Sequence, residues 1–195
     1  MLKDWDCGHR IVACGLVCVS LAASSRAGER DRPDDADLHH VTQVTDRVAW
    51  AFGRQGTALK TTDGGRTWQP VELPVAIDGT AACFLTSNVG WVAGHVDTGD
   101  PKACRLLSTT DGGKTWKVGE VPYRRIATIR FFDLDNGIIG GCGVGEHARG
   151  VSKTSDGGRT WTSLPGGEVA SWRAAAFTSQ NEGLLGGPGL RLGDV

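Results

Sequence analysis

The stretch TTDGGRTW at residues 61–68 decides the fold, because it recurs as TTDGGKTW at 109–116 and as TSDGGRTW at 154–161. The aspartates of the first two copies lie 48 residues apart (positions 63 and 111), and those of the last two lie 45 apart (positions 111 and 156). A period of roughly 40–50 residues is typical of four-stranded propeller blades and is longer than most solenoid repeats. The spacing therefore predicts an all-β chain built as a β-propeller.

Each copy is predicted to be a structural turn between the third and fourth strands of a blade. An Asp side chain accepts hydrogen bonds from the backbone that follows it, paired glycines permit positive φ, and the Trp offers apolar surface for packing between blades. Equivalent turns lie around the rim of a propeller, so their carboxylates are not expected to converge, and no catalytic set, metal or cofactor is predicted. The residues assigned to these structural turns are Asp63, Gly65, Thr67, Trp68, Asp111, Gly113, Thr115, Trp116, Asp156, Gly158, Thr160 and Trp161.

Short β-rich runs separated by Gly, Asn and Asp turns predict about three and a half four-stranded blades. The expected blades cover residues 38–74, 80–122, 126–165 and, incompletely, 171–195, and the first strand of the third blade is expected from Ala127. The sequence ends before the next copy of the turn would fall, near position 201. Because an open propeller leaves strand edges and an apolar face uncovered, we expect a fragment of a larger propeller; self-association through the open blade edges and an open arc are the alternatives.

The N-terminus has the layout of a signal peptide over residues 1–27. Lys3 and Arg10 precede an apolar run at 11–23, and small residues follow at Ser25 and Ala27. The run is shorter than the roughly 20 residues that span a bilayer, so no stable membrane insertion is expected after cleavage. The polar segment 28–37 is predicted to be a disordered leader, and the mature protein is expected in the periplasm or outside the cell.

Charge and cysteine content bound the remaining possibilities. The formal net charge is −1, which gives no basic field to attract nucleic acid. The mature chain would keep Cys83, Cys104 and Cys142, an odd number. One disulfide with a free thiol, in any of three pairings, and three small buried thiols both remain open. The histidines His39, His40, His95 and His147 are expected to be structural, because their spacing does not define a metal site.

The repeated turn resembles the Asp-box, or BNR repeat, of sialidases and several other propellers. More specifically, residues 50–63 and 90–116 resemble the photosystem II stability and assembly factor family, and the likeness extends from Leu38 to about Gly187. Members of that family are seven-bladed, exported or lumenal, and non-enzymatic, and they bind partner proteins while a membrane complex is assembled. The resemblance therefore implies a protein-binding or assembly scaffold, of which this chain has about half the blades.

A basic group at the third blade is the candidate partner-binding site. Arg124, Arg125 and Arg130 are expected at the entry to the innermost strand of that blade, where they would meet an acidic segment of a protein partner. The main alternative is a sialidase-like glycoside hydrolase or carbohydrate-binding fragment. That chemistry requires converging arginines and a Tyr nucleophile paired with Glu, whereas Tyr123 is the only tyrosine. A truncated, non-functional remnant is the third possibility.

Overall fold

The computed structural model describes residues 37–98, 103–148, 150–164 and 172–187. The predicted signal peptide (1–27) and all but the last residue of the predicted leader (28–37) lie outside these residues. The described residues contain β-strands and one short 3-10 helix, η2 (Gly145–His147), which confirms the all-β fold class.

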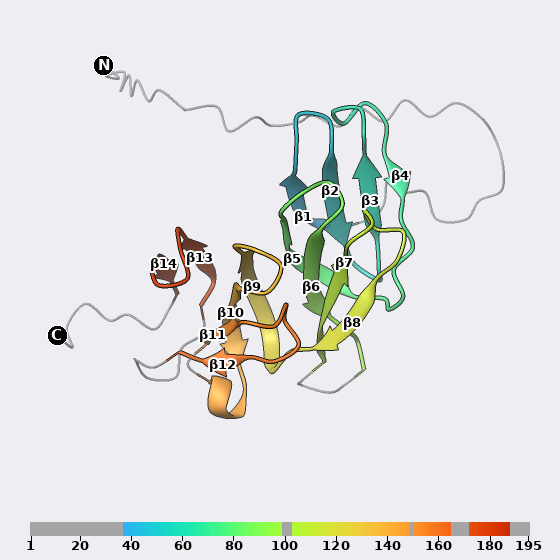
Figure 1. The fold of residues 1–195 in the computed structure, drawn as a ribbon. Helices are drawn as coiled ribbons and strands as arrows, with labels where there is room; N and C mark the ends of the chain where they lie inside the picture. Colours follow the sequence, from blue (N-terminus) through green and yellow to red (C-terminus); the bar gives the residue numbers. More distant parts are fainter. Residues whose placement is uncertain (1–36, 99–102, 149, 165–171, 188–195) are drawn as a thin grey trace, which may run out of the picture.

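The strands form three four-stranded sheets and one two-stranded sheet, which we call blades 1 to 4 (Figure 1). Blade 1 contains β1 (Leu38–Gln43), β2 (Ala49–Gly53), β3 (Ala58–Thr61) and β4 (Gln69–Pro70). Blade 2 contains β5 (Asp78–Phe84), β6 (Gly90–His95), β7 (Cys104–Thr109) and β8 (Lys117–Glu120). Blade 3 contains β9 (Tyr123–Phe131), β10 (Gly137–Gly143), β11 (Val151–Thr154) and β12 (Thr162–Ser163). The two-stranded blade 4 contains β13 (Ala174–Phe177) and β14 (Gly183–Gly186).

Every blade is an antiparallel meander, in which the order of strands in the sheet follows their order in the chain. Tight turns between neighbouring strands produce this topology, and it places the first strand of each blade at one edge of its sheet. The second strands lie inside the sheets, and β6 is buried along most of its length whereas β5 alternates between buried and half-buried residues. A sheet whose inner strands are covered on both faces must pack between two neighbours.

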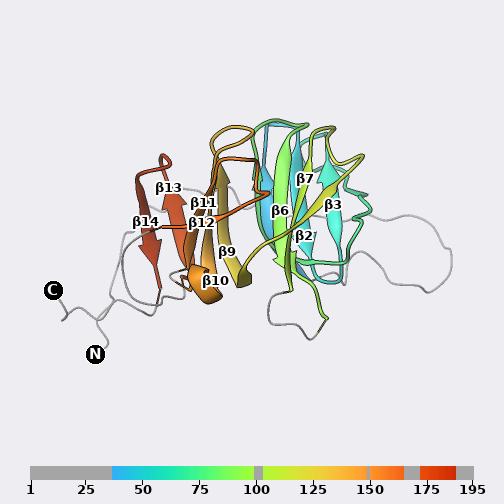
Figure 2. The ribbon, with the colours of Figure 1, turned by 60° about the horizontal axis from the view of Figure 1, so that its bottom comes forward.

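The blades lie side by side in chain order, with blade 1 and blade 4 at opposite ends of the row (Figure 2). Two hydrophobic clusters fill the spaces between the first three blades. The cluster between blades 1 and 2 contains Trp50, Phe52, Val92 and Leu107, with Phe84 and Trp116 packed against it. The cluster between blades 2 and 3 contains Cys83, Trp91, Leu106, Ile129, Phe131 and Ile139, with Trp161 packed against it.

An aromatic contact recurs at each of these two interfaces. Trp50 of β2 stacks on Phe84 of β5 with ring centroids 5.1 Å apart, and Trp91 of β6 stacks on Phe131 of β9 at 3.8 Å. Phe131 lies over Gly137, where a Cβ atom would come within 2.8 Å of the ring. Blades 2 and 3 thus each receive the tryptophan ring of the preceding blade on a phenylalanine that lies over a glycine of the neighbouring strand.

One predicted strand boundary is wrong, and it matters for the candidate site. β9 begins at Tyr123, four residues before the expected Ala127. Its ladder with β10 continues through Ile126 opposite Gly141 and Arg125 opposite Cys142 to Tyr123, with two register shifts on the way. The hairpin is longer than in the other blades because β10 runs on through its glycines to Gly143.

The three cysteines of the predicted mature chain are free thiols in this structure. Cys83 and Cys104 are buried on blade 2, and burial raises the pKa of Cys104 to about 11. The Cys83 Sγ accepts a hydrogen bond from the Phe131 backbone N–H at 3.3 Å and donates to the Phe131 carbonyl at 3.8 Å. Cys83 therefore links the first strands of blades 2 and 3 while filling core space.

Candidate functional site

The repeated turns use their carboxylates internally. In the first turn Thr61 Oγ1 donates to Asp63 Oδ1 at 2.8 Å, the Thr67 N–H donates to Oδ1 at 2.9 Å, and Thr67 Oγ1 donates to Oδ2 at 2.7 Å. The same three bonds recur around Asp111, from Thr109 and Thr115, and around Asp156, from Thr154 and Thr160. The paired glycines have positive φ in all three turns, from +73° to +91°. Each carboxylate is thus held by its own turn and lies in a separate blade.

These hydrogen bonds lower the pKa of Asp63, Asp111 and Asp156 to about 2. The largest cause is the Thr67 backbone N–H for Asp63, the Thr115 hydroxyl for Asp111 and the Thr160 hydroxyl for Asp156. A carboxylate with a depressed pKa in the folded state contributes stability above its unfolded pKa of about 4, and that contribution is lost as the pH falls toward 2.

We therefore predict that Asp111→Asn lowers the melting temperature at pH 7 and that its deficit relative to the wild type shrinks below about pH 4. Melting curves between pH 7 and pH 3 measure this. The control is Glu72→Gln, which changes an exposed carboxylate outside the turns. A deficit that stays constant down to pH 3 would contradict the prediction.

The turns also receive hydrogen bonds from the preceding blade. Lys60 of β3 lies 5.0 Å from the centre of the Trp50 ring, and its Nζ donates to the Gly112 carbonyl at 2.8 Å. Trp91 of β6 donates from Nε1 to the Gly157 carbonyl at 3.2 Å. In the second and third blades the repeated turn is therefore a connection between sheets as well as within one.

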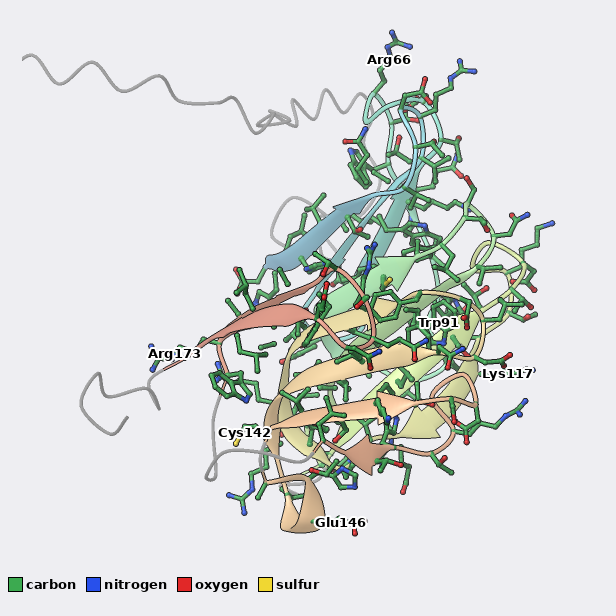
Figure 3. The ribbon with its side chains drawn as sticks, turned by 60° about the vertical axis from the view of Figure 1, so that its left-hand side comes forward. Arg66, Trp91, Lys117, Cys142, Glu146 and Arg173 are labelled. Atoms are coloured by element: carbon green, nitrogen blue, oxygen red, sulfur yellow. The ribbon has the colours of Figure 1, made fainter. Side chains whose placement is uncertain are left out.

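The tryptophans that end the turns complete the same interfaces. Trp116 meets the Trp50 ring edge-on, with centroids 5.9 Å apart, and Trp161 meets Phe131 at 6.3 Å. The Arg or Lys of the turn is exposed in each case, and Arg66 extends away from the sheets (Figure 3). The described geometry gives the turns a packing role, and the cation of each turn is among its solvent-exposed residues.

The three candidate arginines lie on β9, but they do not form one group. Arg124 and Arg125 are exposed at its start, and Arg130 is exposed near its end. Arg130 lies five positions after Arg125 along the strand, roughly 16 Å at 3.3 Å per residue. The expectation that all three lie at the entry to the strand is wrong for Arg130, because β9 starts before the arginine pair. What remains together is Arg124 with Arg125.

A buried polar network holds the start of β9. The Tyr123 hydroxyl donates to Ser152 Oγ of β11 at 3.0 Å, and Ser152 Oγ lies 2.8 Å from Nδ1 of His147 in η2. His147 Nε2 in turn lies 3.4 Å from Oε1 of Glu146, the exposed middle residue of η2 (Figure 3). Tyr123, Ser152 and His147 are all buried. The network connects β9, β11 and η2 immediately beside Arg124.

The sequence contained little sign of this network. Tyr123 and His147 lie 24 residues apart (positions 123 and 147), and only the fold brings them to the same serine. Burial raises the pKa of Tyr123 well above its usual range. A fully buried tyrosine bonded to a serine does not present the accessible nucleophile that the sialidase alternative requires.

No cluster of three or more His, Cys, Asp or Glu side chains in the described part of the chain is placed to hold a metal ion. No described helix is long and apolar enough to cross a membrane.

Comparison with known proteins identifies the fold. No protein-family model and no curated protein matches this sequence. The structure of YCF48 bound to D1 peptide matches with a TM-score of 0.58 and 21% identity, over 73% of this chain and 45% of that chain. YCF48 from Cyanidioschyzon merolae matches with a TM-score of 0.51 and 21% identity, over 68% of this chain and 41% of that one. The GH74 enzyme of Niastella koreensis matches with a TM-score of 0.55 and 17% identity, over 74% and 25%.

The chain thus spans less than half the length of the proteins it matches. Its three four-stranded sheets and the two-stranded one correspond to blades of those proteins. The chain is structurally similar to the YCF48 propeller over about 70% of its residues and has the fold of a partial β-propeller.

Proposed function

We propose that this chain is a protein-binding propeller segment without catalytic activity, and that it binds an acidic, extended peptide segment at Arg124 and Arg125. The observation that carries the proposal is an exposed arginine pair at the start of β9, next to a tyrosine that is buried and hydrogen-bonded. YCF48, a protein with the same fold, has been solved bound to a peptide, which supports this class of partner.

The chemistry of the site favours carboxylates. Guanidinium groups donate in a planar fork that matches a carboxylate, and they keep their charge at all physiological pH values. The Tyr123 network fixes the backbone beside Arg124, so less conformational freedom is lost when a ligand is bound. The Thr80 hydroxyl of β5 donates to the Ile126 carbonyl of β9 at 3.0 Å, which ties the same strand to blade 2.

A labelled peptide of about ten alternating Glu and Ala residues is expected to bind, with an affinity that falls as salt is added. The double variant Arg124→Ala/Arg125→Ala is expected to weaken binding by about tenfold or more, because two charge-assisted contacts are lost. Fluorescence anisotropy measures both effects. Arg66→Ala, which removes an exposed arginine from blade 1, is the control variant, and a Gln/Ala peptide is the control ligand. Equal affinity of the double variant and the wild type would overturn the proposal.

The second candidate function is glycoside hydrolysis, which the match to a GH74 enzyme favours. The buried position of Tyr123 counts against a sialidase-type mechanism, and the carboxylates of the repeated turns are engaged in their own blades. Incubation with a panel of chromogenic glycosides and β-glucans is expected to give no turnover above that of the heat-denatured protein. Turnover at an enzyme-like rate would establish the alternative, whereas a chain that neither folds nor binds would point to a remnant.

Export is part of the same proposal and rests on the apolar run at 11–23 with its basic flank. When the whole chain is expressed in a bacterial host, N-terminal sequencing of the periplasmic fraction is expected to begin near Gly28. An uncleaved N-terminus in the cytoplasmic fraction would contradict export.

A further inference from the structure

The two end faces of the row of blades carry exposed apolar side chains. Val41 of β1 is 61% exposed and Leu184 of β14 is 80% exposed. These strands belong to the first and last blades, which lie at opposite ends of the row (Figure 2). Between the ends, the corresponding surfaces are covered by neighbouring blades.

Leu184 occupies the position from which each blade packs against the next. In the ladder between first and second strands, Trp50 lies opposite Thr42, Trp91 opposite Cys83, Ile138 opposite Arg130 and Leu184 opposite Ala176. The first three side chains are buried, with exposed fractions of 0%, 4% and 1%. Ala174 and Ala176 are exposed beside Leu184. Blade 4 therefore has an apolar face on the side away from blade 3, and no described blade packs on that face.

The opposite end is built differently from the interior blades. Phe84, Phe131 and Phe177 lie opposite Gly90, Gly137 and Gly183, and a Cβ atom at these glycines would come within 2.1 to 2.8 Å of the ring. At the same register in blade 1, Gln43 lies opposite Ala49. Both the phenylalanine and the glycine beneath it are therefore replaced in blade 1. The rear face of blade 1, the face on the side away from blade 2, has no phenylalanine on which a tryptophan could stack.

This rear face suits a smaller, aliphatic side chain. Gln43 Nε2 donates to the Thr45 carbonyl at 3.1 Å, so its amide has a partner and its methylene groups lie beside Ala49. Val41 lies opposite Ala51, which lies opposite Leu59 of β3. The residues at the same positions in blade 2 are Ala82, Val92 and Leu107, and all three contribute to the cluster between blades 1 and 2.

We infer that two copies of this chain associate head to tail into one closed ring, in which Leu184 of each copy packs on the Val41 and Gln43 face of the other. The match to YCF48 covers 45% of that chain, so two copies hold about the number of blades in one such propeller. A two-fold axis through the centre of the ring relates the two copies, so the same contact forms twice and both end faces are covered. This inference goes beyond the proposed peptide site and does not depend on it.

The mass of the protein in solution tests the inference. Multi-angle light scattering of the wild type is expected to give twice the mass of one chain. Leu184→Asp and Val41→Asp are each expected to raise the dissociation constant about 100-fold or more, because each ring loses two apolar contacts. Both side chains are exposed in the single chain, so the variants are expected to fold, and circular dichroism checks this. Leu134→Asp, at a 58% exposed leucine in the turn between β9 and β10, is the matched control and is expected to keep the wild-type mass.

Mixing the two variants tests the head-to-tail arrangement itself. In a ring of one Leu184→Asp chain and one Val41→Asp chain, one of the two contacts joins a wild-type Leu184 to a wild-type Val41. A ring of either variant alone has an Asp in both contacts, so the mixture is expected to associate more tightly than either variant alone. A symmetric contact of Leu184 with Leu184 would leave Val41→Asp fully dimeric and would overturn the inference. A wild type that is monomeric at tens of micromolar, or that grows into open filaments, would also overturn it.

Discussion

Phe131→Ala is expected to lower the free energy of unfolding by about 3–5 kcal/mol, the usual cost of truncating a buried phenylalanine. The ring is 1% exposed, stacks on Trp91 at 3.8 Å and is met edge-on by Trp161. Its removal leaves a cavity between blades 2 and 3 that β9 cannot close while Cys83 holds the Phe131 backbone. Urea unfolding followed by tryptophan fluorescence measures the loss.

The control for this substitution is Val118→Ala on β8, where the side chain is 44% exposed and the expected loss is within about 0.5 kcal/mol. A loss below about 1.5 kcal/mol for Phe131→Ala would mean that the stack is not central to the interface. The double variant with Trp91→Ala then isolates the interaction between the two rings, expected at about 0.5–1.5 kcal/mol beyond their separate burial.

Gly113→Ala is expected to lower the free energy of unfolding by about 2–5 kcal/mol. Gly113 has a φ of +87°, and a Cβ atom there would lie 2.4 Å from Cη2 of Trp50 in the neighbouring blade. The left-handed backbone costs an alanine roughly 1–2 kcal/mol, and overpacking against a fully buried indole adds about 1–3 kcal/mol.

Gly145→Ala is the matched control, because Gly145 also has a positive φ, +58°, but no atom lies within 4 Å of the added Cβ. It is expected to cost only the backbone strain, about 1 kcal/mol. The difference between the two variants therefore measures the contact between blades 1 and 2. Equal losses would show that the repeated turn needs its glycines only for backbone conformation.

Most of the fold could be predicted from the sequence because the repeated turn fixes a register. The sequence predicts which strand each segment forms, since Gly53, Gly94 and Gly141 each follow, three residues later, the apolar residue of a second strand (Trp50, Trp91 and Ile138). It also predicts that the turn tryptophans pack between blades, as Trp116 and Trp161 do. These are local patterns repeated at a similar spacing, 48 and then 45 residues between the turn aspartates, so one repeat helps to interpret the next.

The candidate site was less predictable because it departs from the repeat. The early start of β9 depends on a longer pairing with β10, and two register shifts are not visible in residue types. The network of Tyr123, Ser152 and His147 depends on the path of η2, a 3-10 helix with no counterpart among the described residues of the other blades. Features that occur once have no second copy in the sequence against which they can be compared.

The hydrogen bonds from Lys60 and Trp91 onto the turns of the next blades also bear on how the molecule opens. Because each of these turns accepts a hydrogen bond through a backbone carbonyl from the neighbouring sheet, separating two sheets breaks it, and opening is a shared event between neighbours. Blade 2 has such a neighbour on each side, whereas β14 has none described beyond it. In a single chain outside the ring, amide exchange is then expected to be slowest in β6 and β7 and fastest in β14, and the end of the row, not its centre, limits how long the blades stay packed.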